Sequence, residues 1–566
     1  MSSLAPGERL RLRLHQAGRL GRRLGLRPLL QGWLRWRDLG ASGSELVIAP
    51  PDLRTADPTI AMDIYAGRYV FAGQAVEAAG QSPFTLPPPS PDWARQLHGF
   101  GWLRHLRAAE TALARSNGRA IVADWLRTQA RGSGIAWEPQ VAARRTLAFL
   151  AQSGLILDGA DHDFYRRFVR LLLAHARFLR ARLQTLEAGL PRLRAIVAIA
   201  MTGLSLSRQE RLARSWLERL DQELESQVLP DGGHASRNPA ALVQALVDLL
   251  PLRQALVARG LEPSPVLVRS VERMMPMLRF FRHGDGVFAQ FNGVSSSAAD
   301  RVATVLAYDE ALGTPVSSAA YSGYERVEAG PSLLIVDAGP PPPMALSERA
   351  HAGTLSFEFS SGASRIVINC GAPARRHSAL CRAARETAAH STATLNDASS
   401  SRFSGPEPDA RIVSGPRKVE RQRIVDADGS HRLRLSHDGY VRQFGLRHER
   451  VLSLARDGLA LAGSDGFSGR GEPQARFAVR FHLHPQVKVQ EAEEETACFL
   501  ALPHGSVWRF EADWPVYVEE SVYLSDVTGR LPTRQLVLEG LLRDRPSVTW
   551  RLARWGGGRE PRRRAA

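Results

Sequence analysis

TLSFEF, residues 354–359, decides the fold class of the second half of this chain. Leu355, Phe357 and Phe359 alternate with polar residues, and a period of two places side chains alternately on the two faces of a β-strand. The same alternation recurs in FAVRFHL, and turn-forming peptides such as DADG and HDG separate the apolar runs. Residues 321–555 are therefore predicted to form a large antiparallel β-sandwich.

Toward the N-terminus the hydrophobic period changes to that of a helix. In RLARSWLERLDQEL, apolar residues recur every fourth position from Leu212 to Leu224 and make one stripe. Similar stripes, separated by Gly, Pro and Asn, fill residues 61–320. Many amphipathic helices joined by short turns indicate paired helices in an α/α toroid. The run GPPPP (339–343) marks a stiff connection at the start of the sandwich.

Both ends of the chain are rich in arginine and are predicted to lie outside the two domains. Residues 1–60 form a basic, partly disordered arm, and residues 556–566 form a disordered basic tail. An alternative for the arm is an amphipathic surface helix around Trp33 and Trp36. No apolar run approaches the roughly 20 residues of a membrane helix, and no apolar segment with a small-residue cleavage site follows the first arginines. We therefore expect neither a transmembrane segment nor a signal peptide.

The net charge of +17 favours an anionic partner, such as nucleic acid, anionic lipid or an acidic polysaccharide. Nearly all of the positive charge is arginine, a skew that genomic base composition also produces, so charge alone leaves the partner open. The basic peptide RFFRHGDG (279–286) lacks a Lys-Ser/Thr pair and an aromatic platform, and no specific nucleic-acid partner is expected. The three cysteines have no CxxC spacing and suggest no disulfide framework.

Five peptides carry more information than periodicity. They are, in order, PDGGHASRNP (230–239), SGYERV (322–327), AHAGTLSFEF (350–359), RIVINCG (365–371) and RETAAHSTATLND (385–397). Together they resemble the heparinase II/III-like family, whose members join an α/α toroid to a β-sandwich and include polysaccharide lyases. The resemblance runs from about residue 80 to about residue 550.

This resemblance implies β-elimination on an acidic polysaccharide that contains uronic acid. The uronate carboxylate must be neutralised, a base must remove the C5 proton, and an acid must protonate the departing O4. In the family, Asn, Tyr and His residues of the cleft between toroid and sandwich supply these groups. A zinc site in the sandwich helps to shape that region.

The toroid motifs of the family match this chain only in part. The helix of GLPRLRAIVAIAMTGLSL resembles one that begins with an Asn-His pair in the family, but Leu190 and Pro191 stand at those positions. The family's DGGH peptide runs on to a Tyr-His pair, and here Ala241 and Leu242 replace it. The neutralising Asn and the toroid Tyr are therefore absent from the matched positions.

The sandwich motif of the family is His-Gly-His-x-Asp before the LSFE strand. Here Arg349 replaces the first His and Gly353 replaces the Asp, whereas His351 remains and matches the first zinc ligand. His390 matches the second zinc ligand and Asn369 falls at the third. The resemblance thus implies zinc as a cofactor, but a neutral amide is a poor zinc ligand. The alternative is a buried histidine pair in a polar network.

The candidate site divides into three groups. The predicted catalytic residues are His234, Tyr324 and Arg349; the predicted substrate-binding residues are Arg237, Asn238, Arg375, His377 and Arg382; and the predicted metal ligands are His351, Asn369 and His390. An arginine suits the carboxylate because its planar guanidinium pairs bidentately with it. The alternatives are a turn and helix cap for the DGGH loop, strand packing for the tyrosine, and a solvated basic loop for the arginines.

The leading hypothesis is a polysaccharide lyase-like protein that binds an acidic polysaccharide in a basic cleft between toroid and sandwich. The alternative from another class is a non-catalytic protein of the cell envelope that binds such a polysaccharide and has lost the lyase residues. The family implies the periplasm or cell envelope, whereas the missing signal peptide favours the cytoplasm. The sequence leaves the oligomeric state open.

Overall fold

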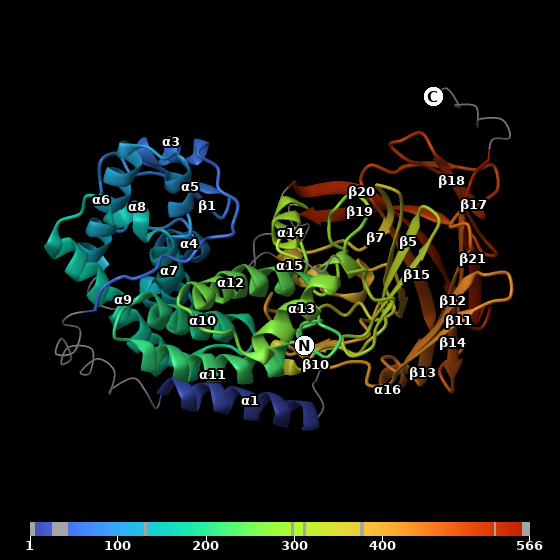
Figure 1. Ribbon diagram of the computed structural model, residues 1–566. Helices are drawn as coiled ribbons and strands as arrows, with labels where there is room; N and C mark the ends of the chain where they lie inside the picture. The colour runs from blue at the N-terminus through green and yellow to red at the C-terminus, as the bar shows by residue number, and fades with distance from the viewer. Residues whose placement is uncertain are drawn as a thin grey trace.

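The computed structural model describes residues 6–24, 44–129, 133–295, 299–309, 313–373, 379–525 and 528–556. Within these ranges a helical first half is followed by an antiparallel β-structure, as the sequence predicts (Figure 1). Helix α1 (Pro6–Leu24) occupies part of the predicted N-terminal arm. Trp33, Trp36 and residues 557–566 lie outside the described residues.

Short polar caps followed by proline begin several toroid helices. Ser90, Asn238 and Ser264 each accept a backbone N–H of the first turn, and a proline follows each of them at the first helical position. The helices are α3 (Thr59–Tyr65), α4 (Pro91–Gly99), α5 (Leu103–Ala108), α6 (Ala112–Gln129), α7 (Pro139–Ala151), α8 (Ser153–Leu157), α9 (His162–Arg182), α10 (Leu190–Ser205), α11 (Glu210–Gln227), α12 (Pro239–Ala258), α13 (Pro265–Phe280) and α14 (Ala299–Leu306).

Helix α10 is the centre of the helical half. It packs against α7, α9, α11 and α12, and nearly all of its side chains from Leu193 onward are buried. The α10–α11 pair approaches closely at Gly203, where a Cβ atom would lie 2.6 Å from the backbone nitrogen of Ala213. By length and composition α12 is the one described helix that is able to cross a membrane, and 72% of its apolar window is buried inside the molecule, as in a core helix.

Two large antiparallel sheets form the second half (Figure 1). One has the order β11 (Val419–Val425), β12 (His431–His437), β13 (Leu446–Leu454), β14 (Ala460–Gly469), β21 (Ser547–Arg554), β18 (Val507–Ala512), β17 (Ala497–Ala501) and β16 (Lys488–Glu491). The other has the order β19 (Tyr517–Ser525), β20 (Gly529–Leu541), β15 (Arg476–Leu483), β7 (Ser364–Ile368), β6 (Phe357–Ser361), β5 (Ser332–Asp337), β4 (Tyr324–Ala329) and β3 (Ser318–Ala319), with β8 (Ala393–Leu395) beside β15. Two small hairpins are β1 (Arg68–Phe71) with β2 (Gln74–Glu77), and β9 (Arg402–Phe403) with β10 (Ile412–Ser414).

The sheet that contains β4 and β5 joins the two halves because both of its faces are buried. On one face, Tyr324 and Ile335 belong to the core of the helical half. On the other face, Val327, Leu334 and Val336 belong to the core between the sheets. Because side chains alternate along these strands, one sheet contributes to both cores and connects the toroid to the sandwich.

Candidate functional site: the cleft between toroid and sandwich

A cleft of about 1330 Å³ opens between the two halves. Its toroid wall comes from the turn between β1 and β2, from α4 and α7, and from the loop before α10. Its opposite wall comes from residues 345–350 and from the loop 404–411 between β9 and β10. Helix α1 contributes Leu12, His15 and Gln16, a contribution that sequence patterning did not predict.

The DGGH loop reaches this cleft through two tightly packed glycines. Gly232 has a φ of +85°, and a Cβ atom there would lie 1.9 Å from the carbonyl oxygen of Arg273. At Gly233 a Cβ atom would lie 2.5 Å from the Cβ of Ser322. Only glycine fits at either position, so this loop is wedged between α13 and the first strands of the sandwich.

His234 lies at the base of the cleft with both ring nitrogens engaged. The backbone N–H of Ser236 donates to Nδ1 at 3.0 Å, so Nδ1 carries no proton and Nε2–H donates to Oε1 of Gln227 at 3.0 Å. Gln227 in turn donates to the buried carboxylate of Glu223 at 2.7 Å. Burial lowers the pKa of His234 to about 4. This geometry leaves His234 a weak base whose lone pair is already occupied.

Arg237 is a structural clamp. Its Nε–H donates to the carbonyl oxygen of Ser322, and its Nη groups donate to the carbonyl oxygens of Gly323, Gly339 and Pro340 and to Oδ1 of Asp337. A guanidinium has five N–H donors, and all five are used within the protein. The expectation that Arg237 binds a substrate carboxylate is therefore corrected, because no donor remains for a ligand.

Tyr324 lies beneath this clamp and away from the cleft. Its hydroxyl donates to the carbonyl oxygen of Arg237 at 2.6 Å and accepts from Nδ2 of Asn292 at 2.7 Å. The Arg237 guanidinium lies 4.7 Å from the centre of the Tyr324 ring. The side chain is fully buried, and burial raises the pKa of Tyr324 well above its usual range. The geometry supports strand packing, the alternative to its predicted catalytic role.

The remaining predicted residues are dispersed. Asn238 lines the cleft and caps α12, because its Oδ1 accepts the N–H of Ala240 at 2.8 Å. Arg349 is exposed and lines the cleft. Arg382 is absent from the described lining and stacks on Phe403 at 3.9 Å. Arg375 and His377 lie outside the described residues.

The three predicted metal ligands are close together. Nδ1 of His351 lies 3.0 Å from Nε2 of His390, and Nδ1 of His390 lies 2.8 Å from the carbonyl oxygen of Glu386. Oδ1 of Asn369 accepts the N–H of Ser391 at 3.0 Å, so His390 and Asn369 are neighbours.

These donors fit zinc poorly. The two imidazoles bond directly to each other, and the third group is an amide oxygen that already has a donor. The Asp of the family's His-Gly-His-x-Asp motif would stand at Gly353. A side chain has no room there, because a Cβ at Gly353 would lie 2.8 Å from the His390 ring. Across the described ranges, no group of three or more His, Cys, Asp or Glu residues could hold a metal ion.

The cleft is polar without being basic. Its described lining contains five arginines and six carboxylates, so the predicted basic cleft is not what the structure presents. Arg95 pairs with Glu138, Arg194 with Asp248, and Arg411 with Glu187. The Arg411–Glu187 pair spans the cleft from sandwich to toroid. Sequence reasoning missed it because 224 residues separate the partners.

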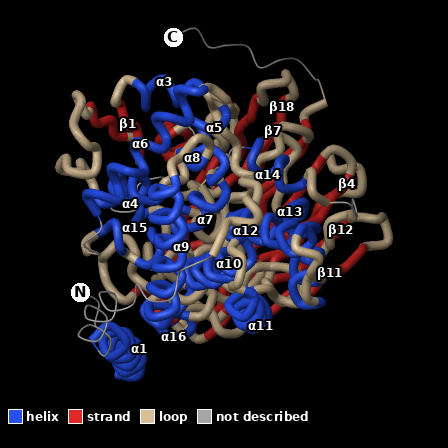
Figure 2. The backbone as a smooth tube through the Cα atoms, turned by 60° about the vertical axis from the view of Figure 1, so that its left-hand side comes forward, coloured by secondary structure: helices blue, strands red, loops and turns tan. Residues whose placement is uncertain are grey.

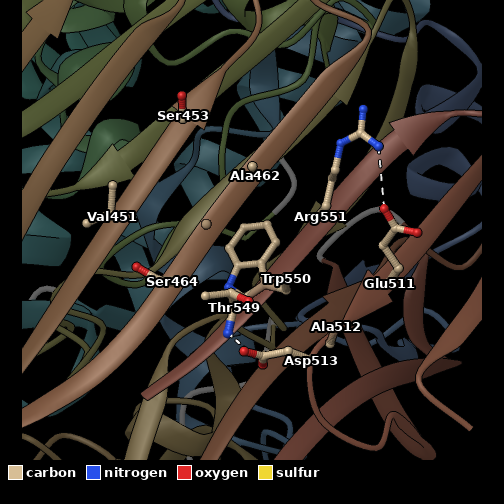
Figure 3. A pocket seen from close by; sticks show the side chains of 11 residues that line it. Val451, Ser453, Ala462, Ser464, Glu511, Ala512, Asp513, Thr549, Trp550 and Arg551 are labelled. Carbon is tan, nitrogen blue, oxygen red and sulfur yellow. Dashed lines mark hydrogen bonds and ion pairs between the residues drawn. The ribbon is translucent and has the colours of Figure 1, made fainter. Parts of the chain in front are cut away.

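A second hollow, of about 420 Å³, lies on the outer face of the sandwich. Figure 3 shows small side chains of β13 and β14, such as Ser453, Ala462 and Ser464, beside an Arg551–Glu511 ion pair. The indole of Trp550 points inward, and its Nε1–H donates to Asp465. None of the predicted site residues lines this hollow.

Chemically, the described lining of the cleft is equipped to hold a polar ligand. It contains exposed Arg349 and several side-chain amides, such as Gln74 and Gln244. It contains no tyrosine, and its one buried histidine bonds within the protein. Leu190 lies in the lining, at the position where the resemblance expects a carboxylate-neutralising Asn.

Comparison with known proteins agrees with this architecture. The family model for the heparinase II/III-like C-terminal domain matches residues 311–551. FtsZ-localized protein C of Caulobacter vibrioides is 33% identical to this chain over 531 residues, which cover 90% of each chain. The chain therefore belongs to the heparinase II/III-like family.

Solved structures share the fold of nearly the whole chain. A crystal structure of heparinase III has a TM-score of 0.70 and 13% identity, and the match covers 98% of this chain and 92% of that one. A mutant of the heparan sulfate lyase HepC from Pedobacter heparinus has a TM-score of 0.63 and 15% identity, covering 89% of this chain and 84% of that one. At such identities the likeness concerns the fold, which confirms the predicted toroid and sandwich.

Proposed function

We propose that this chain is a polysaccharide lyase-like protein that binds a polysaccharide in the cleft without cleaving it by β-elimination. The proposal rests on one observation. Three side chains that the sequence offers for proton transfer and carboxylate binding already form hydrogen bonds within the protein. The hydroxyl of Tyr324 and all five N–H donors of Arg237 bond inside the fold, and His234 accepts a backbone N–H. The cleft itself is retained, so binding remains the activity that its geometry supports best.

The balanced charge of the cleft supports an acidic polysaccharide of low charge density as the ligand. Arg349 and Arg144 place positive charge in the lining and attract a ligand carboxylate, whereas Glu348, Glu407 and Asp409 oppose a dense row of negative charges. Non-sulfated uronic acid polysaccharides should therefore bind better than highly sulfated ones.

A panel of uronic acid polysaccharides tests both parts of this proposal. The purified chain should bind at least one member, and the ultraviolet absorbance of the unsaturated elimination product should stay at the level of the protein-free control. Arg349→Ala should weaken binding, whereas Arg530→Ala, at an exposed position outside the lining, should leave it unchanged. Rising absorbance would establish a lyase instead, and no binding to any member would remove the proposal.

The FtsZ-localized relative supports a second proposal, that this chain also localises with FtsZ. Its 33% identity extends over 90% of both chains, so the helical half shares the similarity as well as the sandwich. A fluorescent fusion should coincide with labelled FtsZ in cells, and the immobilised chain should retain purified FtsZ. A diffuse fusion that retains no FtsZ would contradict this proposal and would leave the polysaccharide proposal untouched.

A further inference from the structure

The excess positive charge of the chain lies outside the cleft, and α9 is one place where it concentrates. This helix carries six arginines and one aspartate. Its inner face is buried in the toroid core through Phe164, Phe168 and Leu172. Four of the arginines, Arg166, Arg167, Arg170 and Arg180, are exposed and project from the outer face of the toroid.

Four of these arginines follow one line along the helix. Arg166, Arg170, Arg177 and Arg180 stand at positions i, i+4, i+11 and i+14, which fall on one face of an α-helix and span about 21 Å. We call these four residues the arginine stripe. Arg166, Arg170 and Arg180 are exposed, and within the described residues none of the three makes an ion pair. The acidic Asp163 belongs to the first turn, where the helix dipole favours it.

A matching acidic surface lies on the hairpin between β16 and β17. Glu491, Glu493, Glu494 and Glu495 are all exposed there, and we call these four residues the acidic hairpin. Arg509 is 3.8 Å from Glu494 and also pairs with Glu511, so the hairpin keeps a strong negative charge. β16 is the last strand of its sheet.

The two surfaces cannot meet within one molecule. Figure 1 shows α9 in the toroid on one side and β17 at the far edge of the sandwich on the other, and Figure 2 brings the toroid with α9 to the front while β18, which pairs with β17, lies behind it. Their charges are complementary: the stripe has three exposed guanidinium groups and the hairpin has four exposed carboxylates, and pairs of these groups form strong bidentate hydrogen bonds.

We propose that copies of this chain associate head to tail, with the arginine stripe of one copy on the acidic hairpin of the next. The contact joins two different surfaces, so it repeats and generates an open line or a closed ring. Because both surfaces are exposed and polar, the association is salt-dependent and reversible.

A second copy fits this surface better than nucleic acid does. The stripe has no free aromatic side chain on which a base could stack, since Phe164, Phe168 and Phe178 are buried and Tyr165 packs against the helical core, with its hydroxyl accepting the N–H of Leu46. With its inner face packed in the toroid, α9 is also unable to enter a major groove as a recognition helix does.

Sedimentation velocity of the full chain over a range of protein concentrations tests the proposal. At low salt the weight-average sedimentation coefficient should rise with concentration, and in 1 M NaCl, where the Debye length is about 3 Å, it should not. R166Q/R170Q/R180Q removes the basic end, and E491Q/E493Q/E495Q removes the acidic end. Each variant alone should remain monomeric, and an equimolar mixture should form a dimer and nothing longer, because each partner keeps one intact end.

A matched control separates the interface from net charge. R211Q/R214Q/R530Q removes three exposed arginines that lie on α11 and β20, and it should associate like the unmodified chain. A monomer at every concentration, association that persists in either end variant, or equal loss in the control would overturn the proposal. Binding of poly-glutamate to the stripe without self-association would also overturn it, in favour of another anionic partner.

Discussion

At the scale of single residues, Arg237 is the clearest case of a side chain that was predicted to bind a ligand and has a structural role instead. Its guanidinium joins the toroid loop to the residues just before β4, to β5 and to the turn that follows β5, and the residue is 7% exposed. The residue has a φ of +58°, a conformation that costs a non-glycine residue on the order of 1–3 kcal/mol. The clamp therefore stabilises a strained backbone.

Replacing Arg237 by alanine should lower the free energy of unfolding by roughly 3–5 kcal/mol, because it leaves Asp337 buried without its partner. Urea unfolding of Arg237→Ala checks the stability. Arg349→Ala is the matched control, because Arg349 is exposed, and its stability should stay close to that of the unmodified chain. An Arg237→Ala variant of unchanged stability would mean that the buried network contributes little to folding.

Zinc binding also depends on single residues, namely His351, His390 and Asn369. Since His351 and His390 bond to each other and Asn369 already accepts an N–H, we expect elemental analysis to find far less than one zinc per chain. Incubation with EDTA should leave the melting temperature unchanged. One tightly bound zinc whose removal lowers the melting temperature would show that the imidazoles rearrange around the metal.

The sequence predicted these residues with unequal success, for a physical reason. His351, His390 and Asn369 were expected to be neighbours, and they are, because each was matched to a position of the family's zinc site. The role of Arg237 was not predictable, because its partners lie 85 to 103 residues away. No local pattern records which carbonyl oxygens will face an arginine once two domains pack together.

At the scale of elements, periodicity predicted the helices and strands well because each helix or strand keeps one apolar face. Strand β4 shows the limit of that reasoning. Tyr324 faces the helical core and Val327 faces the core between the sheets, so alternation on this strand separates two buried faces. A pattern alone does not distinguish an outer face that meets solvent from one that meets another domain.

The close approach of α10 and α11 gives a prediction for an element pair. Gly203→Ala should lower the free energy of unfolding by about 1–3 kcal/mol, because its Cβ would lie 2.6 Å from the backbone of Ala213. Gly154→Ala in α8 is the control, because no atom lies within 4 Å of its Cβ position. That variant should be neutral or more stable by about 0.5–1 kcal/mol, as alanine is favoured over glycine in a helix. Equal effects in the two variants would contradict close packing of α10 on α11.

At the scale of the whole molecule, two cores share one sheet, and the cleft lies where they meet. The Arg411–Glu187 pair crosses that cleft, and Glu8 of α1 pairs with Arg442 and Arg402 of the sandwich. Helix α1 also borders the loop after α9. The relative position of toroid and sandwich is therefore held by ion pairs at the rim as well as by apolar packing.

Buried histidines make the stability of the molecule depend on pH. Burial lowers the pKa values of His98, His105 and His234 to about 4, from 6.5 in the unfolded chain. Between pH 6.5 and 4 the unfolded chain therefore binds more protons than the folded one. Folding stability should decrease as the pH falls through this window, by at most about 1.4 kcal/mol per pH unit for each histidine.

Unfolding in urea at pH 7, 6 and 5 measures this dependence. A His98→Gln/His105→Gln variant should show a shallower decrease, because it has two fewer buried imidazoles to protonate. His162→Gln is the matched control, since His162 is exposed at the start of α9, and it should leave the slope unchanged. A slope that is the same in all three proteins would mean that other groups control the acid unfolding. A stability that rises as the pH falls would contradict the buried, neutral state of these histidines, because a group whose folded pKa is depressed can only lose stability toward acid.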